Sequence, residues 1–215
     1  MKFAVLILTV FLAAVSAAGQ VKKLTSAEFN AAMGSAFGAS SIRPRREIKK
    51  SVTYEKGKVV QTSTVTEEFI PPYRSRSHFL SDIVGNKSEK EWVIVDGQRY
   101  TLSYVGGEWY RDSALPTYPS MTVGPDVQVE TDKYTKYTSQ KAKLLGKPVT
   151  ILKRVETSRP GALWGTTTYI VYVGAEAAIV RIEQKNVESG KGNYTNELTT
   201  YEYNPKGLKI EAPIK

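Results

Sequence analysis

Few residues in this chain are suited to catalytic chemistry. There is one histidine, His78, and no cysteine, so His78 has no thiolate partner with which to start a zinc site. No serine lies in a G-x-S-x-G turn, and none stands three residues before a lysine. Val105–Glu108 reads as a turn with no helix after it, so a phosphate-binding glycine loop is also missing.

Paired carboxylates are the remaining catalytic option. Glu67, Glu68, Asp82 and Asp96 could in principle supply the two groups of a glycosidase. In a β protein most such residues are solvated, and a sequence fixes no separation between them. We therefore expect a protein that binds rather than catalyses, with no cofactor and no metal.

The start of the chain resembles a cleavable signal peptide. Met1-Lys2 is basic, Phe3–Ala14 is apolar, and small residues follow at 16–18. The apolar run is shorter than the roughly 20 residues of a membrane span, which disfavours a retained anchor. We predict a leader at 1–18, cleaved between Ala17 and Gly19, and a single periplasmic or secreted domain at 19–215. No cysteine is present to carry a lipid anchor.

The chain carries a net charge of +9, part of it in one early segment. Such a segment can contact anionic lipid headgroups or a protein, or it can simply be a solvated surface. Export makes nucleic acid the poorer partner. The residues of this candidate contact surface are Arg43, Arg45, Arg46, Lys49 and Lys50.

One helix is predicted near the new N-terminus. Thr25 and Glu28 have the spacing of a capping box, and Leu24 and Phe29 that of a hydrophobic staple. Apolar side chains then recur at helical spacing, at Phe29, Met33, Ala36 and Phe37. Gly38 is the expected stop, after about three turns.

After Pro44 the sequence is typical of strands. Lys56-Gly57 and Asp96-Gly97 mark hairpins, while Pro71-Pro72 and Gly85-Asn86 each end a strand. Residues 112–128 are proline-rich and read as a loop. The expected strands lie at 47–70 (interrupted by the first hairpin), 74–84, 92–95, 99–105, 109–110, 149–156, 166–173, 177–184, 197–203 and 208–211. Short turns between consecutive strands favour an antiparallel meander.

Several strands alternate between apolar and polar residues. Tyr100, Leu102 and Tyr104 share one face, and Ala178, Val180 and Ile182 share another. One short helix is too small to cover so many strands. The sheet is therefore expected to curl on itself or to be completed by a ligand.

Three stretches resemble the LolA-like lipoprotein carriers of the bacterial envelope. They are Phe69–Arg76; Trp92–Tyr100 with Gly107-Glu108-Trp109; and Gly146–Val149 together with Tyr169–Glu183 and Tyr201–Pro213. The resemblance implies a mostly β (α+β) fold in which a strongly curved antiparallel sheet forms a half-barrel, with an N-terminal amphipathic helix and few others. It also implies a concave apolar face that takes acyl chains.

Two functions follow as hypotheses. The first is a periplasmic protein that holds a lipid or the acyl chains of a lipoprotein, by burying methylene groups at roughly 0.8 kcal/mol each. The second is an envelope interaction or sensor module that binds another protein through the basic surface and carries no lipid. The expected cavity lining is Trp92, Ile94, Tyr100, Leu102, Tyr104, Trp109, Val180 and Ile182.

Overall fold

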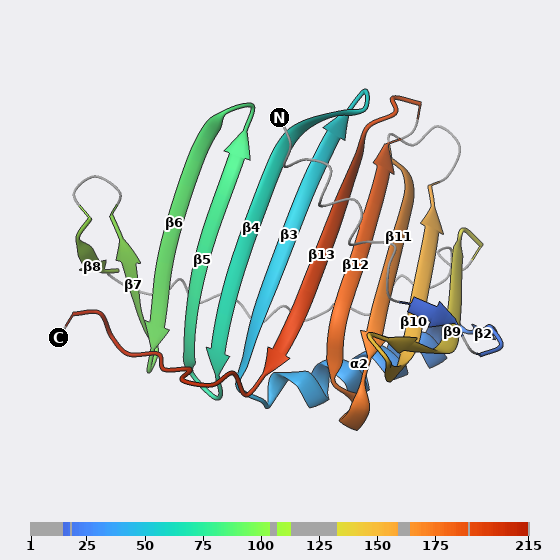
Figure 1. The fold of residues 1–215 in the computed structure, drawn as a ribbon, viewed down its shortest axis with the longest axis horizontal. Helices are drawn as coiled ribbons and strands as arrows, with labels where there is room; N and C mark the ends of the chain where they lie inside the picture. Colours follow the sequence, from blue (N-terminus) through green and yellow to red (C-terminus); the bar gives the residue numbers. More distant parts are fainter. Residues whose placement is uncertain are drawn as a thin grey trace.

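The computed structural model describes residues 15–17, 19–103, 107–112, 133–158, 164–188 and 190–214, and the side chains of all of these except 15–17 and 164. Within these residues the chain forms one antiparallel sheet of thirteen strands, which stays open and does not close into a barrel (Figure 1). One α-helix packs against it. The predicted fold class is confirmed.

The strands follow each other closely along the chain. They are β1 (Val15–Ala17), β2 (Lys22–Leu24), β3 (Arg45–Glu55), β4 (Lys58–Ile70), β5 (Arg74–Ile83), β6 (Asn86–Val95), β7 (Gln98–Leu102), β8 (Trp109–Arg111), β9 (Thr135–Leu144), β10 (Lys147–Thr157), β11 (Trp164–Val173), β12 (Ile179–Glu188) and β13 (Tyr194–Tyr203).

Two meanders make up the sheet. Strands β3 to β8 pair in chain order, and so do β9 to β13. The last strand, β13, pairs with β3 and joins the two meanders into one surface. Both β1 and β2 pair with β9 at the far edge. Strand β1 lies within the predicted leader at 1–18. The cleavage of that leader remains a prediction.

Four tight turns fix the register of the hairpins. Each has a residue followed by glycine, and both residues have positive φ: Lys56-Gly57, Val84-Gly85, Asp96-Gly97 and Leu145-Gly146. Turns with positive φ at both central residues match the right-handed twist of the strands they connect, and glycine adopts this conformation without steric cost. The hairpins at Lys56-Gly57 and Asp96-Gly97 were predicted from the sequence, and at Gly85 the end of a strand was predicted.

The helix, α2 (Ser26–Ser41), begins as its sequence predicts. The Thr25 side chain accepts from the Glu28 backbone N–H at 3.2 Å, and the Glu28 carboxylate accepts from the Thr25 N–H at 2.8 Å. Phe29, Met33 and Ala36 are buried. In the described part of the chain, none of the helices has the length and apolar character needed to span a membrane.

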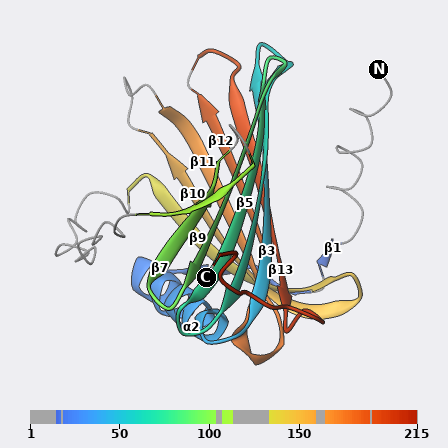
Figure 2. The same ribbon diagram turned by 90° about the vertical axis from the view of Figure 1, so that its left-hand side faces the viewer.

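The main core lies between α2 and one face of the sheet, which we call the helix face. Phe29, Met33 and Ala36 pack there against Leu152 of β10, Val171 of β11 and Ile179 of β12. Figure 1 shows α2 running across the lower ends of β10 to β13, and Figure 2 shows the strong twist of the sheet around it. The helix therefore leaves β3 to β8 uncovered.

A second cluster lies on the opposite face, which we call the far face. Because successive side chains of a strand point to opposite faces, Tyr172 lies on the far face while Val171 lies on the helix face. Tyr172 packs with Ala142, Leu144 and Val149. This half of the sheet is thus apolar on both faces.

The helix is longer than predicted. It has 16 residues and passes through Gly38, the expected stop, to end at Ser41. Gly38 does not have a positive φ and no neighbouring atom crowds it, so neither a turn nor a close contact requires glycine there. Bonds between Ser40 and the sheet, described below, hold the additional turn in place.

Several predicted strands also differ. Strand β9 and the first half of β6 were missed, since their Lys-, Ser- and Glu-rich sequences have low strand propensity. Residues 208–211 were predicted as a strand but form part of an irregular tail, in which Ile210 is buried. Most of the predicted loop at 112–128 lies outside the described residues.

The Val84 turn provides a test of the register. Val84 is 78% exposed and has a φ of 50°, a conformation that a β-branched residue adopts only under strain. Val84→Asn should stabilise the domain by about 1 kcal/mol and raise the melting temperature by roughly 2–4 °C, because asparagine is favoured at this turn position.

The matched control is Val59→Asn, at a half-exposed position in the extended strand β4. Asparagine has low strand propensity, so this variant should be no more stable than the parent. Thermal denaturation followed by circular dichroism measures both variants. Equal melting temperatures for Val84→Asn and the parent would contradict a strained, positive-φ conformation at Val84.

Candidate functional site

A groove of about 360 Å³ lies on the helix face, beside the end of α2, where the helix no longer covers the sheet. Its walls come from α2 and from β3, β4, β11, β12 and β13. The lining residues are Phe37, Glu47, Lys49, Val65, Glu67, Tyr169, Ile182, Gln184, Glu197, Thr199 and Tyr201.

One side of the groove is apolar. Tyr169, Ile182 and Tyr201 pack against the core beneath α2. Phe37 overhangs them from the helix, and 46% of its surface is exposed. Burial raises the pKa of both Tyr169 and Tyr201 above the ordinary value for tyrosine, since the apolar surroundings disfavour the phenolate.

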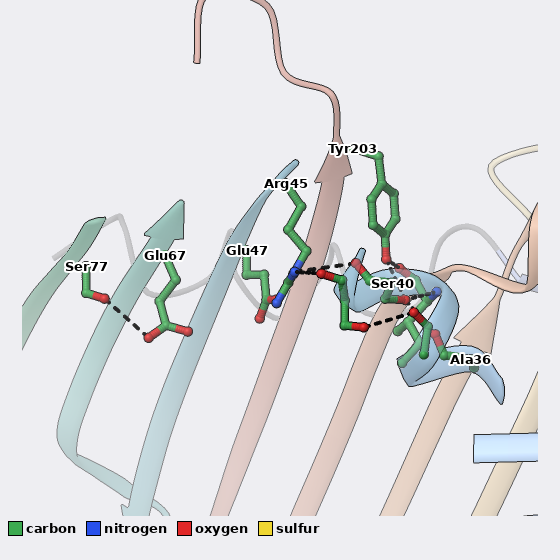
Figure 3. A network of polar contacts seen from close by, with 10 residues as sticks. Ala36, Ser40, Arg45, Glu47, Glu67, Ser77 and Tyr203 are labelled. Carbon is green, nitrogen blue, oxygen red and sulfur yellow. Dashed lines mark hydrogen bonds and ion pairs between the residues drawn. The ribbon is translucent and has the colours of Figure 1, made fainter. Parts of the chain in front are cut away.

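The other side is polar and charged. Glu47 of β3 and Glu67 of β4 are direct cross-strand partners, an arrangement that is unfavourable for like charges. Arg45 pairs with Glu47, and the Ser77 hydroxyl donates to Glu67 at 3.4 Å (Figure 3). Further along, Lys49 Nζ lies 3.0 Å from Glu197. The groove thus has one apolar wall and one wall of charged and hydrogen-bonding side chains.

Beyond the groove the helix face becomes polar. Ser51, Ser63, Ser81 and Ser88 are successive cross-strand partners on β3, β4, β5 and β6. They therefore lie in one row across the sheet, on the same face as Glu67. Trp92 and Ile94 of β6 add apolar surface on this same face, away from α2.

A buried hydroxyl holds the end of α2 above the groove. Ser40 is 4% exposed, and its Oγ accepts from the Ile179 N–H at 3.0 Å and donates to the Ala36 carbonyl at 2.7 Å. The Tyr203 hydroxyl lies 2.9 Å from Ser40 Oγ and donates to the Ile179 carbonyl at 2.7 Å. Figure 3 shows this cluster joining α2 to β12 and β13.

Arg45 supplies a second tie at the same end of the helix. Its guanidinium donates to the carbonyls of Ser40 and Ser41 at 3.4 Å and lies over the Phe69 ring. A cation here satisfies carbonyls at the negative end of the helix dipole. Together with the Ser40 cluster, it fixes where Phe37 projects.

The predicted lining residues do not share one surface. Trp92, Ile94 and Ile182 lie on the helix face, and among them Ile182 lines the groove. Tyr100, Leu102 and Trp109 lie on the far face by their pairing. Tyr104 lies outside the described residues.

Val180 changes face because of a bulge. The pairing steps from Tyr172–Arg181 to Val173–Ile179, which leaves Val180 as an extra residue in β12. Val180 packs against the far-face cluster, whereas Ile182 packs against the helix-face core. The prediction that these two residues share a face is wrong for that reason.

The basic segment is also split between faces. Arg45 and Lys49 belong to the helix face, and Arg46 and Lys50 to the far face, because they alternate along β3. Arg46 pairs with Glu68 and Glu202, and Arg43 with Glu176. Most of this charge is therefore matched by carboxylates, while Lys50 is exposed.

The candidate catalytic groups are dispersed. His78 lies 2.7 Å from Glu89 on the far face, Glu68 pairs with Arg46, and Asp96 with Arg74. Asp82 accepts from the Gly85 N–H at its turn. Over the described part of the chain, no group of three or more His, Asp or Glu is arranged to hold a metal ion.

Sequence reasoning missed most of the groove. Phe37 was expected to face the core, but it is half exposed and lines the groove. Glu47, Glu67 and Tyr201 come from strands that are distant in sequence, and no local pattern brings them together. Ser40 carried no sequence pattern that distinguishes a buried anchor from a surface hydroxyl.

No family model matches the chain, and no curated protein matches it in sequence. The search of solved structures finds LprF from Mycobacterium bovis, with 11% identity, a TM-score of 0.46 and coverage of 87% of this chain and 98% of that one. It also finds a putative outer membrane lipoprotein-sorting protein domain from Vibrio parahaemolyticus, with 8% identity, a TM-score of 0.32 and coverage of 86% and 95%.

A third structure is a DUF1329 family protein from Desulfovibrio piger, with 12% identity, a TM-score of 0.32 and coverage of 85% of this chain and 94% of that one. One of the three names thus belongs to the class that the sequence resembles. All three TM-scores are below 0.5, and nothing about family, ligand or partner follows from these likenesses.

The Ser40 anchor can be tested by stability. Ser40→Ala leaves the Ile179 N–H buried without its acceptor, which should cost about 1–3 kcal/mol of the free energy of unfolding. Urea denaturation measures the loss. Ser41→Ala is the control, because Ser41 is exposed and its hydroxyl bonds within the helix, to the Gly38 carbonyl. That change should stay within about 0.5 kcal/mol, and equal effects at both positions would contradict the anchor.

Proposed function

We propose that this protein binds an amphiphilic ligand, a lipid or the acyl chains of a lipoprotein, in the groove beside α2. The observation that carries the proposal is the exposed Phe37 ring above Tyr169, Ile182 and Tyr201. An aromatic side chain held over an apolar wall, with an opening between them, leaves hydrocarbon surface that a guest would cover.

The size and composition of the groove suit part of such a ligand. Ligand pockets commonly span about 300–1,000 Å³, so 360 Å³ accommodates one chain or a segment of it. Each buried methylene contributes roughly 0.8 kcal/mol, before the cost of association is subtracted. The side with Glu47, Glu67 and Lys49 would face the polar end of the ligand.

The setting of this function is proposed from the sequence. A leader at 1–18 would deliver residues 19–215 to the periplasm or the cell exterior as one domain. Transport of lipids or lipoproteins within the envelope is then the role that we infer. No enzymatic activity is part of this proposal.

The alternative function, an envelope sensor that binds a protein through the basic segment, has less support. Four of the five residues of that segment form ion pairs within the chain, and the segment is divided between two faces. A partner would have to compete with those carboxylates for the same cations.

Extraction of the purified mature protein tests the proposal directly. Lipid mass spectrometry of material purified without detergent should detect a bound acyl-bearing molecule in near-stoichiometric amount. Protein that is free of lipid, and that does not bind added fatty acids or phospholipids, would refute acyl binding. A lipid-free protein with a defined protein partner would favour the sensor.

A substitution locates the ligand. Phe37→Ser should weaken binding of a fluorescent fatty acid by about 1 kcal/mol, roughly fivefold. The reason is that the substitution removes the exposed part of the ring that the ligand would cover. Stability should change little, since the ring is already half exposed. Titration monitored by fluorescence measures the affinity.

The matched control is Ile42→Ser. Ile42 is 73% exposed at the end of the same helix and does not line the groove. Its affinity for the fatty acid should equal that of the parent. Identical affinities for the Phe37 and Ile42 variants would place the ligand elsewhere.

A further inference from the structure

The outer edge of β6 is only partly paired. Strand β7 pairs with Trp92–Val95, the last four residues of β6. Among the described residues, no strand pairs with the outer side of 86–91. Figure 1 shows this upper part of β6 at the margin of the sheet, with β7 and β8 splayed away below it. Residues 86–90 are all exposed.

The turn before β6 determines which backbone groups face outward. In the two-residue turn Val84-Gly85, the Asn86 N–H is directed at the Ile83 carbonyl of β5. Because the direction alternates along a strand, the backbone groups of Ser88 and Lys90 also point to β5. Those of Lys87, Glu89 and Glu91 point away from the sheet and are available to another strand.

Side-chain charges select one way of pairing this edge with itself. In an antiparallel pair of identical strands, a two-fold axis passes through one residue, and its neighbours then face each other. An axis at Glu89 would place two glutamates opposite each other, and an axis at Lys87 two lysines. With the axis at Ser88, Lys87 of each copy faces Glu89 of the other.

We propose that the protein forms a two-fold dimer in which 86–90 of β6 pairs antiparallel with the same segment of a second copy, with the axis at Ser88. Lys87 and Glu89 would exchange backbone hydrogen bonds across the interface, and their side chains would form ion pairs. Exposed edges are commonly protected by charge, but here the alternation of Lys87 and Glu89 is complementary to itself.

The residue at the axis suits close approach. Ser88 ends the row of serines on the helix face, so a small hydroxyl meets a small hydroxyl. Since the two-fold axis stands perpendicular to the joined sheet, both helix faces would lie on the same side. The two grooves of the dimer would then open in the same direction.

Charge exchange tests the pairing. Sedimentation velocity of the mature protein at low salt should show a concentration-dependent dimer. Lys87→Glu and Glu89→Lys should each raise the dimer dissociation constant at least tenfold, because each introduces like-charge contacts twice per dimer. The double variant, K87E with E89K, restores both pairs and should dimerise like the parent.

The control is Lys90→Glu, because Lys90 faces the uncharged Asn86 in the proposed register. This variant should have a dissociation constant within about twofold of the parent's. A protein that is monomeric at all concentrations would overturn the proposal. So would a dimer that the single exchanges leave intact, or a double variant that fails to recover.

A single cysteine gives an independent readout, because the chain has none of its own. Ser88 would form a non-hydrogen-bonded pair with its copy, with Cα atoms about 4.5 Å apart, within the range of a disulfide. Ser88→Cys should therefore crosslink under mild oxidation. Lys90→Cys should not, because its copy would lie about 13 Å away along the strands. Equal crosslinking at both positions would contradict the register.

Discussion

The packing of α2 against β10, β11 and β12 is the interaction on which the rest of the molecule depends. A sheet with an apolar face must cover it, and Phe29, Met33 and Ala36 cover the part formed by Leu152, Val171 and Ile179. Ser40 and Arg45 then tie the last turn of the helix to β12, β13 and β3. The helix is long enough for one half of the sheet only, and the groove lies where its cover ends.

The position of the groove at this boundary explains its mixed lining. Toward the helix, the sheet presents aromatic and branched side chains that belong to the core. Away from the helix, the same face presents the serine row and the Glu47–Glu67 pair, which water can solvate. The expectation from sequence was a continuous apolar concavity. The groove instead has an apolar wall beside a charged one, a lining that matches an amphiphile better than a purely hydrocarbon guest.

Features encoded by neighbouring residues were predictable, and features that depend on distant contacts were not. The capping box at Thr25 and Glu28 and the glycine turns at 57, 85 and 97 follow from local chemistry. The end of the helix was misplaced because Ser40 is held by Ile179, which is far away in sequence. Strand β9 was missed because its polar sequence becomes a strand only when paired with β10. The bulge at Val180 reverses the alternation by one residue, which no pattern of apolar residues reveals.

The pairing of β13 with β3 has a consequence for how the chain folds. This ladder runs from Tyr194–Tyr54 to Tyr203–Arg45 and joins an early strand to a late strand at the middle of the sheet. Contacts so distant in sequence form slowly, because a long loop must close first. The strand synthesised first among these, β3, therefore waits with a bare edge until nearly the whole chain has emerged. A chaperone that shields this edge during synthesis would protect the protein from aggregation at its most vulnerable stage.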